Sequence, residues 1–100
     1  MADTITKTRN STNIISRDPS KFKVIFYNDD QTPMDFVVAV LMKIFKHSEP
    51  AAIDLTMKVH NEGKAVAGVY NYEIAEQKGM ETTNHARHSG YPLVVKVEAE

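Results

Sequence analysis

The sequence contains no cysteine and no tryptophan, and only four glycines and four prolines in 100 residues. Without cysteine the chain can form no disulfide, no thiolate nucleophile and no zinc–thiolate site, and this usage suits a reducing cytosol. The longest apolar run, residues 36–42, is far too short to span a bilayer. The first ten residues lack the apolar segment of a signal peptide. We therefore expect a cytoplasmic protein.

The chain also carries almost no net charge. Twelve basic and thirteen acidic residues leave a formal net charge of −1. Nothing in this balance favours a nucleic acid or an anionic membrane as the main partner. Hydrophobic residues make up 42% and charged residues 25%, which is ordinary for a globular domain. The length predicts one such domain.

The first twenty residues differ in composition from the rest. They are rich in Thr, Ser, Asn, Asp and Arg, and after the initial Met their only large apolar side chains are Ile5, Ile14 and Ile15. Such a segment cannot bury enough surface to offset its ordering entropy. We expect a flexible arm over residues 1–20 and a folded core over 21–100. A frayed terminus without a role is the commoner fate of such a segment.

Local patterns predict six elements in the core. Residues 21–27 alternate as a strand, and Thr32-Pro33 predicts a helix start with Thr32 as N-cap and Pro33 at the first helical position. Ser48-Glu49-Pro50 is expected to start the second helix and Asn71 to cap the third, and Gly63 and Gly90 are expected to follow helix ends. The order is β-α-α-β-α-β, which predicts one sheet covered on one face. The predicted helices span about 33–46, 48–63 and 72–88, and the other strands 64–70 and 93–98.

The densest polar cluster is Asn28-Asp29-Asp30, where the first strand gives way to the first helix. A solvated turn is the usual role of such a cluster. Short oxygen-bearing side chains also suit a cation, but a Ca²⁺ loop would need more carboxylates and a glycine. His60, near the end of the second helix, is by itself more often structural than functional. Both readings stay open on spacing alone.

Enzymatic sites have little support. The chain has no G-x-S-x-G motif and no glycine-rich phosphate loop. His85 and His88 stand three residues apart but have no acidic or sulfur partner, so we expect no metal and no cofactor. An acid–base pair of Asp30 with His60 remains possible, and it defines one alternative, a small hydrolase.

Three stretches together resemble the ClpS family. They are residues 23–37 (KVIFYNDDQTPMDFV), residues 59–69 (VHNEGKAVAGV), and Ala75-Glu76 followed by Pro92-Leu93. The resemblance covers about residues 21–98. It implies an α+β sandwich in which a three-stranded antiparallel sheet packs against three helices, a fold also found in ribosomal stalk domains. The resemblance departs at Thr56, where the family often carries Met, and this predicts a wider or more polar pocket.

The resemblance implies specific roles for residues of this chain. Asn28, Asp30 and His60 would hold a substrate's α-amino group, and Asp29 would add negative potential. Glu73 and Lys78 would lie on the surface that faces an unfoldase. A hydrophobic pocket for the substrate's first side chain would be lined by Thr32, Met34, Val37, Thr56, Val59 and Leu93, with Met34 at its gate.

The function implied is that of an adaptor and not of an enzyme. It would bind proteins that begin with Leu, Phe, Tyr or Trp, the N-degrons. It would deliver them to a ClpA-type AAA+ unfoldase, by contact with the N-terminal domain of the unfoldase, for degradation by ClpP. We expect a monomer. A second alternative is a regulatory module that docks on the unfoldase without binding N-degrons. The joint presence of Asn28, Asp30 and His60 favours the first function, because docking alone would not need them.

Overall fold

The computed structural model describes residues 20–100, so all of the expected arm except Ser20 lies outside the described residues. The six elements follow the expected order. They are β3 (Phe22–Tyr27), α1 (Met34–Lys43), α2 (Glu49–Glu62), β4 (Lys64–Tyr70), α3 (Tyr72–His88) and β5 (Val94–Ala99).

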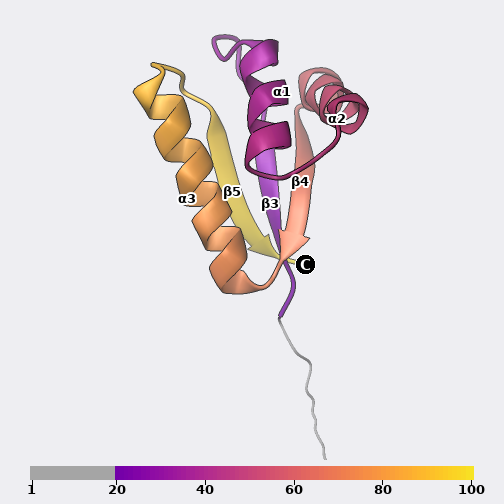
Figure 1. Cartoon of the computed structure of the whole chain (residues 1–100), viewed down its shortest axis with the longest axis vertical. Coiled ribbons are helices and arrows are strands. Elements are labelled where there is room, and N and C mark those ends of the chain that lie inside the picture. The colour runs from indigo at the N-terminus through magenta and orange to yellow at the C-terminus, as the bar shows by residue number, and fades with distance from the viewer. Residues whose placement is uncertain (1–19) are drawn as a thin grey trace, which may run out of the picture.

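The three strands form one antiparallel sheet with β3 in the centre, in the order β4-β3-β5. All three helices lie on one face of this sheet (Figure 1). The predicted α+β sandwich is therefore confirmed. The register between β3 and β4 shifts after Val24, which leaves Ala67 as an extra residue in β4. A bulge of this kind bends its strand and increases the local twist.

Alternation along β3 creates the core. Val24 and Phe26 are almost fully buried, and Phe26 meets Phe45 edge to face with ring centroids 5.4 Å apart. Burial of side chains of this size stabilises the fold by about 1.5–3 kcal/mol each. On the helix-free face, the ammonium groups of Lys64 and Lys96 lie over the ring of Tyr27, at 5.9 and 5.4 Å. That face is covered by lysine side chains in place of a third layer.

The start of α1 corrects one expectation. Pro33, with φ −64° and ψ 143°, is itself the N-cap, and helical geometry begins at Met34. No side chain caps this end of the helix, and the Thr32 hydroxyl instead donates to Asp29 in the preceding loop. The end of α1 also differs: the helix stops at Lys43, and Lys46 adopts a left-handed φ of 63°. A left-handed residue cannot continue a right-handed helix, so the chain turns there toward α2.

The caps of the other two helices match the expectations. Ser48 accepts a hydrogen bond from the Ala51 amide at the start of α2, and Asn71 accepts one from the Ile74 amide at the start of α3. Gly63 ends α2 with a φ of 92°, a conformation that side chains disfavour. Gly79, within α3, is buried against β5, where an added Cβ would come within 3.3 Å of a Val97 methyl. The missing side chain of Gly79 lowers the helix propensity of α3 but allows the helix to pack closely on the sheet.

One hydrogen bond brings the two halves of the candidate site together. The amide of Asn28, just after β3, donates to the carbonyl oxygen of Gly63, just after α2, over 2.8 Å. In Figure 1 the end of β3, the start of α1 and the end of α2 accordingly meet at one edge of the sheet, together with the α3–β5 connection. This edge carries the pocket described next.

Candidate functional site

A small pocket lies at this edge of the sheet, between α1, α2 and the loop that follows β3. Its cavity volume is about 20 Å³, which is close to the room needed by one water molecule. The residues that line it come from three separate segments of the chain. They are Tyr27, Asn28, Asp29, Thr32, Met34, Val37, Thr56, Val59, His60 and Leu93.

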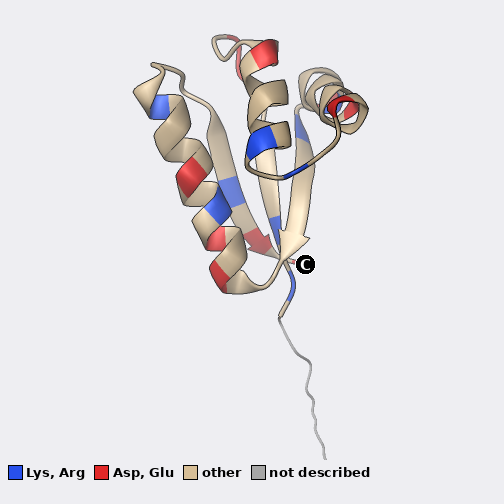
Figure 2. Ribbon diagram, in the orientation of Figure 1, with Lys and Arg blue, Asp and Glu red and all other residues tan. Residues whose placement is uncertain are grey.

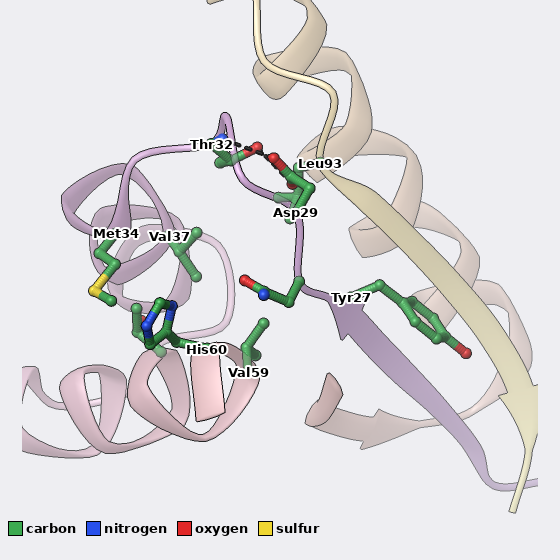
Figure 3. A pocket seen from close by; sticks show the side chains of 10 residues that line it. Tyr27, Asp29, Thr32, Met34, Val37, Val59, His60 and Leu93 are labelled. Carbon is green, nitrogen blue, oxygen red and sulfur yellow. Dashed lines mark hydrogen bonds between the residues drawn. The ribbon is translucent and has the colours of Figure 1, made fainter. Parts of the chain in front are cut away.

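The polar rim of the pocket is formed by Asn28 and His60. Both side chains are exposed, and both line the cavity. The backbone of Asn28 is held by its bond to Gly63, and His60 stands on the last turn of α2, so the two residues are fixed relative to each other. In Figure 3 the imidazole of His60 projects from α2 toward Met34 and Val37 of α1. An amide oxygen and an imidazole nitrogen are both acceptors suited to an ammonium group.

Asp29 organises the loop between β3 and α1. One carboxylate oxygen accepts hydrogen bonds from the amides of Gln31 and Thr32, at 2.8 and 2.7 Å, and the other accepts one from the Thr32 hydroxyl at 2.8 Å. Burial raises the pKa of Asp29, but these hydrogen bonds and the charge of Arg87 outweigh it and hold the pKa below its ordinary value. The carboxylate therefore stays ionised and adds a negative field at the rim.

The wall of the pocket is apolar and tightly packed. Val37, Val59 and Leu93 are between 1% and 6% exposed, whereas Met34 at the mouth is 40% exposed. The Thr56 hydroxyl donates to the Ala52 carbonyl within its own helix, over 2.8 Å, so its proton is not free for a ligand. Although Thr56 predicts a wider or more polar pocket, the cavity in this structure is narrow.

A leucine or phenylalanine side chain needs far more space than this cavity offers. The walls must therefore move when such a group enters. Met34 has the greatest freedom among the apolar lining residues, since its unbranched side chain is partly in solvent. Met34 is therefore the apolar lining residue best able to make room for a larger group.

The structure brings together most of the residues that the sequence suggested for the site. Asn28, Asp29 and His60 join the six expected pocket residues around one cavity. Asp30 is exposed and is not among the lining residues, so its expected contact with the amine stays a prediction. Tyr27 was not expected; it belongs to the lining, but its ring points away from the other labelled side chains (Figure 3).

Glu73 and Lys78, expected on the unfoldase-facing surface, lie on α3. Glu73 is exposed in the first turn, at the end of α3 that is remote from the pocket edge in Figure 1. Lys78 donates to the Ile44 carbonyl over 2.8 Å, and its ammonium lies 5.3 Å from the centre of the Tyr70 ring. Lys78 therefore anchors the end of α1 to α3. Its role in binding a partner stays a prediction, as does that of Glu73.

Charged side chains are not gathered into one large patch. Acidic and basic residues follow one another along α3 (Figure 2). The segment from Asn28 to Met42, by contrast, has acidic residues and no lysine or arginine. This segment therefore supplies negative charge to the rim, which favours a cationic ligand group, although the charge of Arg87 also reaches Asp29.

Within residues 20–100 no group of three or more His, Asp or Glu side chains is placed to hold a metal ion. None of the helices in the same range is long and apolar enough to cross a membrane.

Comparison with known proteins agrees with this geometry. Residues 17–96 match the family described as ATP-dependent Clp protease adaptor protein ClpS. The adapter protein ClpS of Wolinella succinogenes is 49% identical over 80 residues, which cover 80% of this chain and 78% of that protein. The ClpS of Helicobacter hepaticus is 41% identical over 88 residues, which cover 88% of this chain and 89% of that protein.

A solved structure is also similar. Agrobacterium tumefaciens ClpS2, in a structure described as bound to L-phenylalaninamide, superposes with a TM-score of 0.80 and 38% sequence identity. The match covers 83% of this chain and 100% of that one. These relatives define the class: an adaptor of the ATP-dependent Clp protease, with no catalytic activity of its own. The chain belongs to the ClpS family. An adaptor of this protease implies an unfoldase as partner.

The role of Asp29 in the loop yields a pair of variants. Asp29→Asn should lower the free energy of unfolding by about 1 kcal/mol at pH 7, because hydrogen bonds to a charged acceptor become bonds to a neutral one. Asp30→Asn is the matched control, since Asp30 is exposed, and should change stability by less than about 0.5 kcal/mol. Urea unfolding of the three proteins measures both values.

The same comparison has a defined pH dependence. The pKa of Asp29 is lowered in the folded state. Its stabilisation is therefore present above the ordinary value of 3.8 and is lost as the pH falls through the lowered folded value. The difference between wild type and Asp29→Asn should shrink as the pH falls below 3.8 and vanish only below the lowered folded pKa. Equal stability of Asp29→Asn and wild type at pH 7 would contradict the role of Asp29 in the loop.

Proposed function

We propose that this chain captures proteins by a free N-terminal α-amino group and a large apolar first side chain, and delivers them to a ClpA-type unfoldase for degradation by ClpP. The side chains in question are those of Leu, Phe, Tyr and Trp. The observation that supports the proposal most strongly is the pocket itself: an acceptor-lined rim directly beside an apolar cavity. L-phenylalaninamide, to which one relative is described as bound, combines a free amine with an aromatic side chain.

The rim suits an α-ammonium group. Such a group has three N–H donors and an ordinary pKa of about 7.7–8.0, so it is largely protonated at neutral pH. Asn28 and His60 supply acceptors, and Asp29 supplies negative charge. Charge-assisted hydrogen bonds contribute about 1.5–3 kcal/mol each, and burial of a Leu or Phe side chain contributes a similar amount. After the costs of association, binding in the micromolar range or tighter is expected.

The competing functions have less support. A module that only docks on an unfoldase has no need for acceptors beside an apolar cavity. A hydrolase would need Asp30 in contact with His60, and Asp30 does not line the pocket.

The most direct test uses three fluorescent peptides and the full chain. One begins with Leu, the second is its N-acetylated form, and the third has Met placed before the Leu. The first should bind, and the others should bind at least roughly 30-fold more weakly, because a charged hydrogen bond that becomes desolvated in the complex costs about 2–5 kcal/mol when one partner is removed. Fluorescence anisotropy measures the three affinities. Equal binding of the free and acetylated peptides would show that the rim does not read the amine.

A second test concerns the gate. Met34→Ala should let peptides that begin with Ile or Val bind, because branching at Cβ places a methyl where the Met34 side chain closes the mouth. Met57→Ala is a matched control, since Met57 is 41% exposed, like Met34, but does not line the pocket. Affinities for Leu-, Ile- and Val-initiated peptides are compared. Wild-type selectivity in Met34→Ala would exclude the gate.

A third test separates delivery from capture. Glu73→Lys should slow degradation of a Leu-initiated reporter by reconstituted unfoldase and ClpP about fivefold, since reversal of a contact charge weakens association. Its affinity for the Leu peptide should stay unchanged, because Glu73 is remote from the pocket (Figure 1). Glu81→Lys, another exposed acidic residue of α3, serves as control. If the two variants degrade the reporter equally, Glu73 is not part of the docking surface.

A further inference from the structure

Arg87, in the last turn of α3, holds the chain that leads into the pocket. A single guanidinium nitrogen, Nη1, donates to the carbonyl oxygens of Tyr91 and Leu93, at 2.8 and 2.9 Å. Residues 91–93 belong neither to α3 nor to β5, and Pro92 has no amide hydrogen to contribute. The backbone of this connection therefore depends on Arg87 and on the bond from the Tyr91 amide to the Ala86 carbonyl, over 2.9 Å.

This connection positions part of the pocket wall. Leu93 is 1% exposed and lines the cavity. Its own carbonyl is one of the two groups that Arg87 binds, so a shift of that carbonyl would move the Leu93 side chain. The Tyr91 ring, two residues earlier, packs edge to face on Phe36 of α1, with ring centroids 4.9 Å apart. The connection is thus clamped between α3 and α1.

Arg87 also acts on the other side of the pocket. Its positive charge favours the ionised form of Asp29, the carboxylate that fixes the loop between β3 and α1. Arg87 therefore holds the 91–93 connection to α3 and adds a favourable charge near the Asn28–Pro33 loop, which contributes Asn28 to the rim. It does so without lining the pocket itself.

We propose that Arg87 is a positioning residue for the pocket: by holding the Tyr91 and Leu93 carbonyls it fixes the Leu93 wall and sets the affinity for the substrate's first side chain. This inference rests on the proposed function of N-terminal capture. A guanidinium suits the task because it is planar, permanently charged and able to present several donors at fixed angles. A lysine ammonium at the same place would keep the charge but would not reproduce that geometry.

The test compares three single substitutions in the full chain. Arg87→Gln removes the charge, Arg87→Lys keeps it, and His88→Gln is the control, because His88 is the exposed neighbour in the same helical turn. Affinities for peptides that begin with Phe and with Ala are measured by anisotropy and competition, at a temperature where thermal unfolding shows each protein to be folded. The methyl signals of Leu93 are followed by NMR in the ligand-free proteins.

Arg87→Gln should weaken the Phe peptide about tenfold and the Ala peptide by less than twofold, since only the larger side chain touches the Leu93 wall. Arg87→Lys should restore part of the affinity, to within about threefold of wild type, and His88→Gln should match wild type. A role in global stability alone would weaken both peptides by the same factor. The Leu93 methyl signals should shift in Arg87→Gln and stay in place in His88→Gln.

Each outcome decides the proposal. Wild-type affinity for the Phe peptide in folded Arg87→Gln would overturn it, as would an equal loss for the Phe and Ala peptides. If Arg87→Gln does not fold, Arg87→Lys decides, because it must then bind the Phe peptide at least twofold more weakly than wild type. Failure of the wild-type chain to bind the Phe peptide would instead refute the proposed function. In that case the Leu93 methyl signals of Arg87→Gln decide whether Arg87 positions the wall: shifted signals support this role, and unmoved signals overturn it. If Arg87→Gln does not fold, the signals of Arg87→Lys are used instead.

Discussion

The hydrogen bonding of the short loop between β3 and α1 is the constraint on which the site depends. This loop leaves a sheet and enters a helix within six residues, so its amides need partners that neither element provides. Asn28 finds one in the Gly63 carbonyl, and Gln31 and Thr32 find theirs in the Asp29 carboxylate. The polar residues of the site therefore have two functions, because the groups that close the turn also shape the rim.

The different roles of Asp29 and Asp30 in the Asn-Asp-Asp cluster follow from this constraint. Asp29 is engaged by three donors and its geometry is fixed, whereas Asp30 faces solvent. A carboxylate that is already fixed loses no side-chain entropy when a ligand arrives. The negative field at the rim is thus present before a substrate binds. On the opposite side, His60 is held by a helix whose end is fixed by Gly63.

Much of the fold was predictable from short-range chemistry. Ser48, Gly63 and Asn71 marked helix boundaries correctly, because each acts on its own nearby backbone. Thr32 is the exception. Pro33 takes the N-cap position and the Thr32 hydroxyl donates to Asp29, an arrangement that the sequence alone does not rank against capping. The six-element order follows from local patterns, whereas the residues of the cavity follow from the family motif and not from periodicity.

The remaining features depend on distances that no local pattern encodes. Arg87 stands where basic residues are common, at the end of a helix, and that position alone gives no reason to connect it with Leu93. Lys78 is similar, since its partner is a carbonyl 34 positions away in the sequence. Gly79 lowers the helix propensity of α3, and the reason for a glycine there is the short separation between α3 and Val97. Each of these contacts joins elements whose approach is set by the whole core.

The narrowness of the cavity has a consequence for an adaptor that meets many proteins. Because Val37, Val59 and Leu93 are between 1% and 6% exposed, the pocket offers little apolar surface to passing chains. Opening must cost free energy, and every guest meets the same cost. Small side chains recover little of it on burial, while bulky ones recover more. Because this cost is shared, it lowers every affinity by the same factor; under the proposed function only bulky residues would then keep enough affinity to be captured, and unproductive adhesion would be limited.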